Sequence, residues 1–229
     1  MISVFIPCIP KHFENVLNIL RAYWRGDVAP DEIVLFLSKS EDVDQGKILE
    51  LMTLGVRVVC DKNLVEAGPA RQKALLYCTG DIIVYQDADD LPMYNRIAAV
   101  KELFDRFPSM QVLNHWYVFN RATNKELRID WHDCRLIDTD EIYNLYFPNK
   151  KIEDCKKFLA YGHEYENVHA GAVCIRKDVL NHIKWKSKDE LQYAPEPRCK
   201  SEDFEFCMEA LFYLRASKIL MANLYIYKT

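Results

Sequence analysis

The sequence predicts an α/β fold in which a mostly parallel sheet is flanked by helices. Up to about residue 107, short apolar runs alternate with amphipathic stretches, and such a strand–helix repeat is typical of parallel sheets covered by helices. Half of the 229 residues are apolar, which is enough to bury one sizeable core. We therefore expect a single domain over 1–229 with a first half (1–107) and a second half (108–229). Its abrupt end would also suit a domain cut from a longer chain.

Four short apolar runs in the first half predict buried strands, because brief continuous apolar segments suit strands that are covered on both faces. They are ISVFI (2–6), EIVLFLS (32–38), VRVVC (56–60) and DIIVY (81–85).

Three amphipathic segments between these runs predict helices. In HFENVLNILRAYW (12–24), apolar side chains recur every three or four residues and form one stripe. DQGKILELMTLG (44–55) ends on a glycine, as helices often do. GPARQKALLYC (68–78) opens with a proline, which a first helical turn tolerates. The stripe of the first helix consists of Phe13, Leu17, Leu20 and Trp24.

The second half loses this alternation and becomes aromatic-rich. Its last part predicts strand, helix, helix and strand. These elements lie in GAVCIRKDVLNHI (171–183), SEDFEFCMEALFYLRA (201–216) and KILMANLYIYK (218–228).

Composition excludes several classes of function. Thirty basic and 34 acidic residues give a net charge of -4 without a basic run, so nucleic acid is not expected as a partner. The eight cysteines never form a C-x-x-C pair, which favours reduced, buried thiols. The first ten residues have no basic region and no small-residue cleavage site, and there is no N-x-[ST] site and no apolar run of membrane-spanning length. We therefore expect a cytoplasmic protein without a transmembrane segment.

Three aspartates stand within four positions where the fourth predicted strand ends, at the edge of the sheet where ligands bind in such folds. On an extended strand end, Asp87 and Asp89 would point to one side and Asp90 to the other. Two carboxylates that face one site favour a hard divalent cation bound to a diphosphate. The alternative is that the aspartates only begin a helix near Pro92, where the helix dipole favours acidic residues.

A second acidic signal is Ser-Glu-Asp at 201–203. Ser201 suits a helix N-cap and places Glu202 and Asp203 in the first turn of an amphipathic helix. An ionised, oriented carboxylate can act as general base toward an alcohol. The alternative is that both acids only complement the helix dipole.

Taken in order, four blocks resemble the nucleotide-sugar-dependent glycosyltransferases of the GT-A fold, most closely the inverting enzymes of family two. The blocks are ISVFIPCIPKHFENVLNIL, NLVEAGPARQKALLYCTGDIIVYQDADD, AGAVCIRKDVL and SEDFEFCMEAL, and together they span most of the chain. The second block is the most specific, because the family typically has an Asn, a Gly, an Ala-Arg pair, a Gly-Asp and an Asp-x-Asp-Asp. The matching residues are Asn63, Gly68, Ala70, Arg71, Gly80, Asp81 and Asp87 to Asp90.

The resemblance implies transfer of a hexosyl or deoxyhexosyl unit from a nucleotide sugar, by default a UDP-sugar, to a hydroxyl of a glycan acceptor with inversion. It implies Mn²⁺ or Mg²⁺ as cofactor, with the donor bound by the first half and the acceptor by the second. Asp203 would be the general base and Glu202 the second acid of the pair. The metal ligands would be Asp89, Asp87 and, from the second half, His169, with His163 as a weaker candidate. The nucleotide-sugar pocket would contain Pro7, Cys8, Ile9, Ser38, Arg71, Asp87, Ala88 and Gly171.

The chain departs from the family at two places. Ser38 in LSKSED stands where the family usually has an acid that reads the base, which leaves GDP and dTDP open beside UDP. The Gln-Arg-Arg-Trp-like acceptor motif after the Glu-Asp pair is missing, which favours transfer of a single sugar over processive synthesis. Aromatic side chains that could stack on acceptor sugars are Trp116, Tyr117, Trp131, Tyr143, Tyr146, Tyr161 and Tyr165.

Two rival readings remain open on the sequence. A sugar-1-phosphate nucleotidyltransferase would share the broad fold, but it needs a glycine-rich loop after the first strand, and FIPCIPK contains no glycine. A non-catalytic glycan- or nucleotide-binding module would also share the fold. With only seven glycines there is no G-x-G-x-x-G and no P-loop pattern, which disfavours dinucleotide oxidoreductases and P-loop enzymes.

Overall fold

The computed structural model describes residues 1–119, 128–138, 141, 169–191, 202–214 and 216–227. Within them, nine strands form one sheet with the order β3-β2-β1-β4-β8-β6-β9-β5, and β7 pairs with β9. The strands are β1 (Ile2–Cys8), β2 (Glu32–Leu37), β3 (Arg57–Cys60), β4 (Ile82–Tyr85), β5 (Leu91–Pro92), β6 (Val112–Phe119), β7 (Leu136–Asp138), β8 (Val173–Arg176) and β9 (Ser217–Tyr227).

The first four strands along the chain are the ones that the apolar runs predicted. β3, β2, β1 and β4 are parallel to one another, and every residue of β4 is buried. β8 runs antiparallel to both β4 and β6, whereas β6 and β9 are parallel. The predicted α/β class with a mixed, mostly parallel sheet is therefore confirmed.

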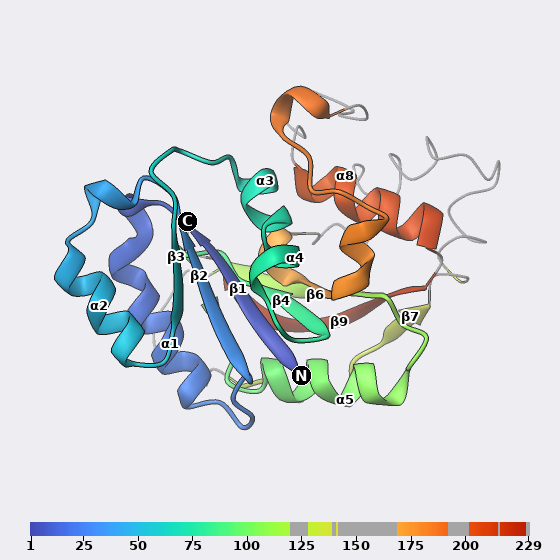
Figure 1. Ribbon diagram of the computed structural model, residues 1–229. Coiled ribbons are helices and arrows are strands. Elements are labelled where there is room, and N and C mark those ends of the chain that lie inside the picture. The colour runs from blue at the N-terminus through green and yellow to red at the C-terminus, as the bar shows by residue number, and fades with distance from the viewer. Residues whose placement is uncertain (120–127, 139–140, 142–168, 192–201, 215, 228–229) are drawn as a thin grey trace.

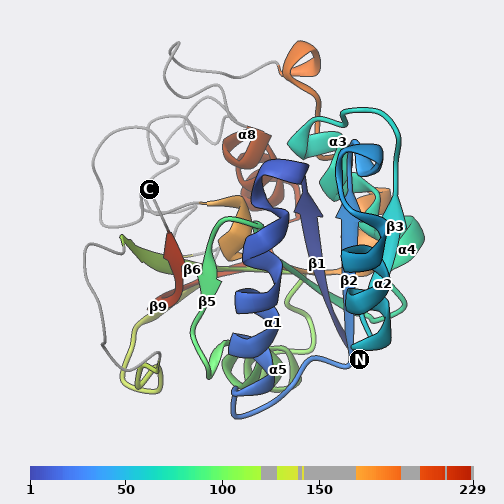
Figure 2. The same ribbon diagram turned by 90° about the vertical axis from the view of Figure 1, so that its left-hand side faces the viewer.

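Helices cover both faces of this sheet (Figure 1). α1 (Val16–Trp24), α2 (Gln45–Thr53) and α5 (Arg96–Arg106) bury their apolar side chains in one core cluster. α3 (Ala67–Gln72), α4 (Ala74–Tyr77) and α8 (Glu202–Glu209) contribute to a second cluster on the other face. In Figure 2, α1 lies in front of the sheet and α5 lies below it.

Some local details differ from the sequence-based expectation. The first helix begins with a 3₁₀ segment, η1 (Pro10–Asn15), and Trp24 at its end is 46% exposed rather than part of the buried stripe. The helix expected after β8 is a short 3₁₀ turn, η4 (Lys177–Asn181). In the described part of the chain, no helix is long and apolar enough to cross a membrane.

Candidate functional site

The site is built around a tight turn that follows β4. The Asp90 amide donates to the Asp87 carbonyl at 3.3 Å, so the chain is no longer extended there and residues three apart approach each other. The expected pairing of Asp87 with Asp89 on one side of an extended strand is therefore not formed. Asp90 is fully buried beside Asp87, while the Asp89 side chain is 48% exposed, with Oδ2 3.8 Å from His12 Nε2.

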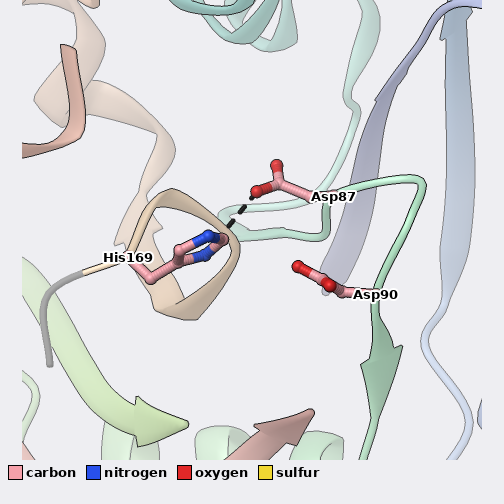
Figure 3. Close-up of side chains that lie close together, drawn as sticks. All are labelled: Asp87, Asp90 and His169. Atoms are coloured by element: carbon pink, nitrogen blue, oxygen red, sulfur yellow. Dashed lines mark ion pairs between the residues drawn. The ribbon is translucent and has the colours of Figure 1, made fainter. Parts of the chain in front are cut away.

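A third ligand group comes from the segment before β8. One ligand atom each from Asp87, Asp90 and His169 lies within 4.8 Å of the others, and Figure 3 shows the three side chains converging from two segments. His169 Nδ1 accepts the Gly171 amide at 3.1 Å and lies 3.6 Å from Asp87 Oδ2. Nδ1 has one lone pair, which accepts the Gly171 amide here, so it can bind a cation shared with the carboxylate only by giving up this hydrogen bond.

The donor chemistry of this cluster fits a divalent cation. Two carboxylates and one imidazole offer the oxygen and nitrogen ligands that Mn²⁺ accepts, and carboxylates also suit Mg²⁺. The cluster contains the predicted ligands Asp87 and His169 together with Asp90, which was not among the predicted ligands. Asp89 lies outside it, and its metal role stays a prediction.

Arg71 connects this cluster to the predicted base helix. Its Nη2 donates to Asp87 Oδ1 at 2.7 Å and its Nη1 to Glu202 Oε1 at 2.6 Å. The side chain is buried, and its Cζ lies 5.2 Å from the centre of the Trp185 ring. Burial alone would raise the pKa of Asp87, but Arg71, with His169 and Arg96, outweighs burial and holds that pKa below its ordinary value.

Asp203 lies beside the same segment that carries His169. Its Oδ2 accepts the Ala170 amide at 3.1 Å, in the 3₁₀ turn η3 (Ala170–Ala172), where Gly171 is also buried. Ser201, the expected N-cap, lies outside the described residues. The three-residue segment 169–171 therefore contacts both the Asp87 cluster and the predicted base.

The other predicted donor-site residues follow the carboxyl ends of β1, β2 and β4. The Ser38 amide donates to the Cys8 carbonyl at 2.9 Å, and Ser38 Oγ accepts the Val65 amide at 3.4 Å. Burial, with a contribution from Asp89, raises the pKa of Cys8 to about 12, so the thiol stays protonated. The Ala88 carbonyl accepts Asn15 Nδ2 at 2.8 Å. Pro7 and Ile9 flank Cys8 at the end of β1 and the turn after it.

Sequence reasoning missed Arg96, which is the largest fully buried side chain among the residues that the structure describes. A cation in the first turn of a helix opposes the dipole, and this was the signal that could have revealed it. Arg96 donates its Nε proton to His115 Nε2. The His115 proton is therefore on Nδ1, which donates to the Trp116 carbonyl at 2.9 Å. The five Arg96 bonds reach His115 Nε2 (3.0 Å), Tyr23 Oη (3.2 Å), Gln86 Oε1 (3.0 Å), Tyr85 O (2.9 Å) and Gly171 O (2.5 Å).

Of the aromatic acceptor candidates, Tyr117 lies at the site, with its ring centre 5.3 Å from that of His169. Trp131 is a buried core residue, and Trp116 lies on β6. The remaining candidates, Tyr143, Tyr146, Tyr161 and Tyr165, lie outside the described residues. His163 also lies outside them.

Solved structures with the same fold bind nucleotide sugars. The chain aligns over 100% of its length with S. aureus TarS 1-349 in complex with UDP-GlcNAc, at a TM-score of 0.63 and 16% identity, and spans 58% of that chain. It aligns equally completely with glucosyl-3-phosphoglycerate synthase from Mycobacterium tuberculosis in complex with Mn²⁺, UDP and glucosyl-3-phosphoglycerate (TM-score 0.57, 15% identity, 72% of that chain). A mannosyltransferase from Pyrobaculum calidifontis in complex with GDP-Man and Mn²⁺ gives a TM-score of 0.60 at 16% identity, with 56% of that chain covered.

A comparison with curated protein sequences gave no match. The family model described as Glycosyl transferase family 2, in contrast, matches residues 3–181, which is most of the chain and includes the Asp87–Asp90 turn, Arg71 and His169. The fold agrees with this match, because the aligned structures share the GT-A-like arrangement. The chain therefore belongs to glycosyl transferase family 2.

Proposed function

We propose that this enzyme transfers a single hexosyl or deoxyhexosyl unit from a UDP-sugar to a hydroxyl of a glycan acceptor, with inversion at the anomeric carbon. One observation carries the proposal. The segment 169–171 contacts the Asp87–Asp90–His169 cluster through His169 and the Asp203 carboxylate through the Ala170 amide. The cluster that could hold a metal and the carboxylate that could act as base thus lie on either side of the same segment, 169–171.

The choice of UDP is supported by TarS and by the synthase, both of which were solved with uridine nucleotides. The mannosyltransferase was solved with GDP-Man, so GDP is the alternative to test, with dTDP third. Residues 1–107 would bind the donor through the ends of β1 and β2 and through Arg71. Residues 108–229 would bind the acceptor.

A divalent cation, Mn²⁺ or Mg²⁺, would be held by Asp87 and His169, with Asp89 or Asp90 as a further carboxylate. When bound, such a cation stabilises negative charge on a departing nucleoside diphosphate. Two of the aligned structures contain Mn²⁺, which supports this choice of cofactor.

Asp203 would act as the general base. Its Oδ2 already accepts the Ala170 amide, so Oδ1 is the oxygen that would take the acceptor's hydroxyl proton. The acceptor oxygen would then bond to the anomeric carbon while the bond from that carbon to the diphosphate breaks. Glu202 is held by Arg71 at 2.6 Å, which favours a positioning role for it.

A comparison of two matched variants tests this assignment. Nucleotide release from UDP-sugars would be measured across a panel of glycan acceptors for wild type, Asp203→Asn and Glu202→Gln. Loss of a general base costs about 10² to 10⁴-fold in kcat, and we expect this for Asp203→Asn, with donor affinity unchanged. Product NMR would report inversion. Wild-type release in the presence of acceptor but equal release by Asp203→Asn would overturn the base assignment.

A cytoplasmic location remains part of the proposal. It is supported by Cys8, Cys60, Cys78, Cys134, Cys174 and Cys207, which are free thiols among the described residues, because reduced cysteines are usual in that compartment.

A further inference from the structure

The Asp87–Asp90 turn is held by a side chain from a distant part of the chain. Tyr225 lies on β9, which carries the last described residues, outside the residues 3–181 that match the family model. Its side chain is fully buried. Its hydroxyl donates to Asp90 Oδ2 at 2.7 Å and accepts the Asp87 amide at 3.2 Å.

The direction of these two bonds follows from the groups themselves. A backbone amide can only donate, so the tyrosine oxygen must accept from Asp87, and its single proton goes to Asp90. Tyr225 therefore donates to the side chain at the end of the turn and accepts from the backbone at its start.

Neighbouring groups fix the Tyr225 ring in this place. Its centre lies 5.5 Å from that of His169, and the Arg96 guanidinium carbon lies 5.2 Å from it. Gly171 leaves the space that the hydroxyl occupies, since a Cβ added there would lie 2.0 Å from the Tyr225 oxygen. Tyr225 thus touches both segments that carry the cluster: the Asp87–Asp90 turn, at its start and at its end, and the segment 169–171.

We propose that Tyr225 is a positioning residue of the metal and donor site, because one hydroxyl clamps both ends of the Asp87–Asp90 turn. This inference rests on the proposed metal-dependent function. Tyr225 orients the ligands without being one of them. Removing a group that orients metal ligands typically costs about 10- to 100-fold in metal affinity. Its removal therefore weakens Mn²⁺ binding by this amount even where the fold persists.

The test is Mn²⁺ binding to the full chain, followed by electron paramagnetic resonance of the free ion, for wild type, Tyr225→Phe and Tyr23→Phe. Tyr23 is the matched control, because its buried hydroxyl donates to Gln86 at 3.1 Å and accepts from Arg96 at 3.2 Å, and neither partner is a carboxylate of the cluster. We expect the Kd for Mn²⁺ to rise about 10- to 100-fold in Tyr225→Phe and to stay unchanged in Tyr23→Phe.

Each other outcome has a defined meaning. Wild-type binding with an unchanged Kd in Tyr225→Phe, or an equal loss in both variants, would overturn the positioning role while leaving the proposed function intact. Absence of Mn²⁺ binding in wild type would overturn both. Gly171→Ala provides a second route to the same clamp: it should weaken Mn²⁺ binding, and adding Tyr225→Phe should weaken it no further. Effects that multiply would contradict the shared mechanism.

Discussion

Arg71→Met tests the link between the Asp87 turn and α8. The Arg71 side chain is 6% exposed, and its partners Asp87 and Glu202 are each 16% exposed, at 2.7 and 2.6 Å. Removing one member of a buried ionic network leaves uncompensated charge and costs about 3–5 kcal/mol. For a domain of this size, this loss corresponds to a fall in Tm of roughly 6–20 °C. It is a large share of a typical free energy of unfolding of about 5–15 kcal/mol.

The loss should depend on pH in a defined direction. Arg71 depresses the pKa of Asp87 below 3.8, so its contribution to stability is present above the unfolded value and disappears as pH falls through the folded value. In Arg71→Met, only His169 and Arg96 still oppose burial, so the pKa of Asp87 rises and the carboxylate protonates at a higher pH than in wild type. The stability gap between wild type and variant should therefore be widest near neutral pH and narrow as pH approaches 3.8.

Urea unfolding at several pH values measures this gap. The control is Lys101→Met, because the Lys101–Asp105 pair is 57% and 66% exposed and should cost less than about 1 kcal/mol. Adding Asp87→Asn to Arg71→Met removes one stranded charge and should restore part of the stability. A loss in Arg71→Met no larger than in Lys101→Met, or a gap that stays constant with pH, would refute the reasoning.

Three further predictions concern other parts of the site. Gly68→Ala should destabilise the protein by about 1–3 kcal/mol, measured by urea unfolding, because overpacking is costly and the added Cβ would lie 2.0 Å from the Lys186 carbonyl oxygen; an unchanged midpoint would contradict this packing. Burial, followed by the charge of Arg96, holds the pKa of His115 well below 6.5, so only the unfolded state binds a proton at this histidine as pH drops below 6.5. The free energy of unfolding should therefore fall with pH in that range, and less steeply in His115→Gln. Equal slopes would show that His115 is not the cause of the fall. Asp89→Ala should leave the unfolding free energy within about 0.5 kcal/mol of wild type, since the side chain is 48% exposed, yet should reduce metal-dependent nucleotide affinity in calorimetry; a large loss of stability would assign Asp89 a structural role.

The first half of the fold could be read from the sequence because its strands are local, continuous apolar runs. β1, β2, β3 and β4 lie within a few residues of their expected bounds. The order of the second half could not be predicted, because β8 inserts antiparallel between β4 and β6, and no periodicity encodes which edge a later strand joins.

The site was predictable in its residue types but not in its geometry. Asp87, Arg71 and Asp203 were identified from motifs, His169 was expected because the second half often completes the metal site in this fold, and the four residues lie around one place. The pairing of Asp87 with Asp90 depends on a turn that the extended-strand argument did not include. Tyr225 gave no signal, because its bonds to the turn span more than 130 positions of the sequence, and a tyrosine in an apolar strand indicates only core packing.

The central claim is that this enzyme binds a nucleotide through a divalent cation at the Asp87–Asp90 turn. Calorimetric titration with UDP, GDP and dTDP, each with and without Mn²⁺, tests it most directly. We expect UDP to bind only when Mn²⁺ is present and Asp89→Ala to lose this binding. Failure of all three nucleotides to bind, or equal affinity with and without Mn²⁺, would contradict it.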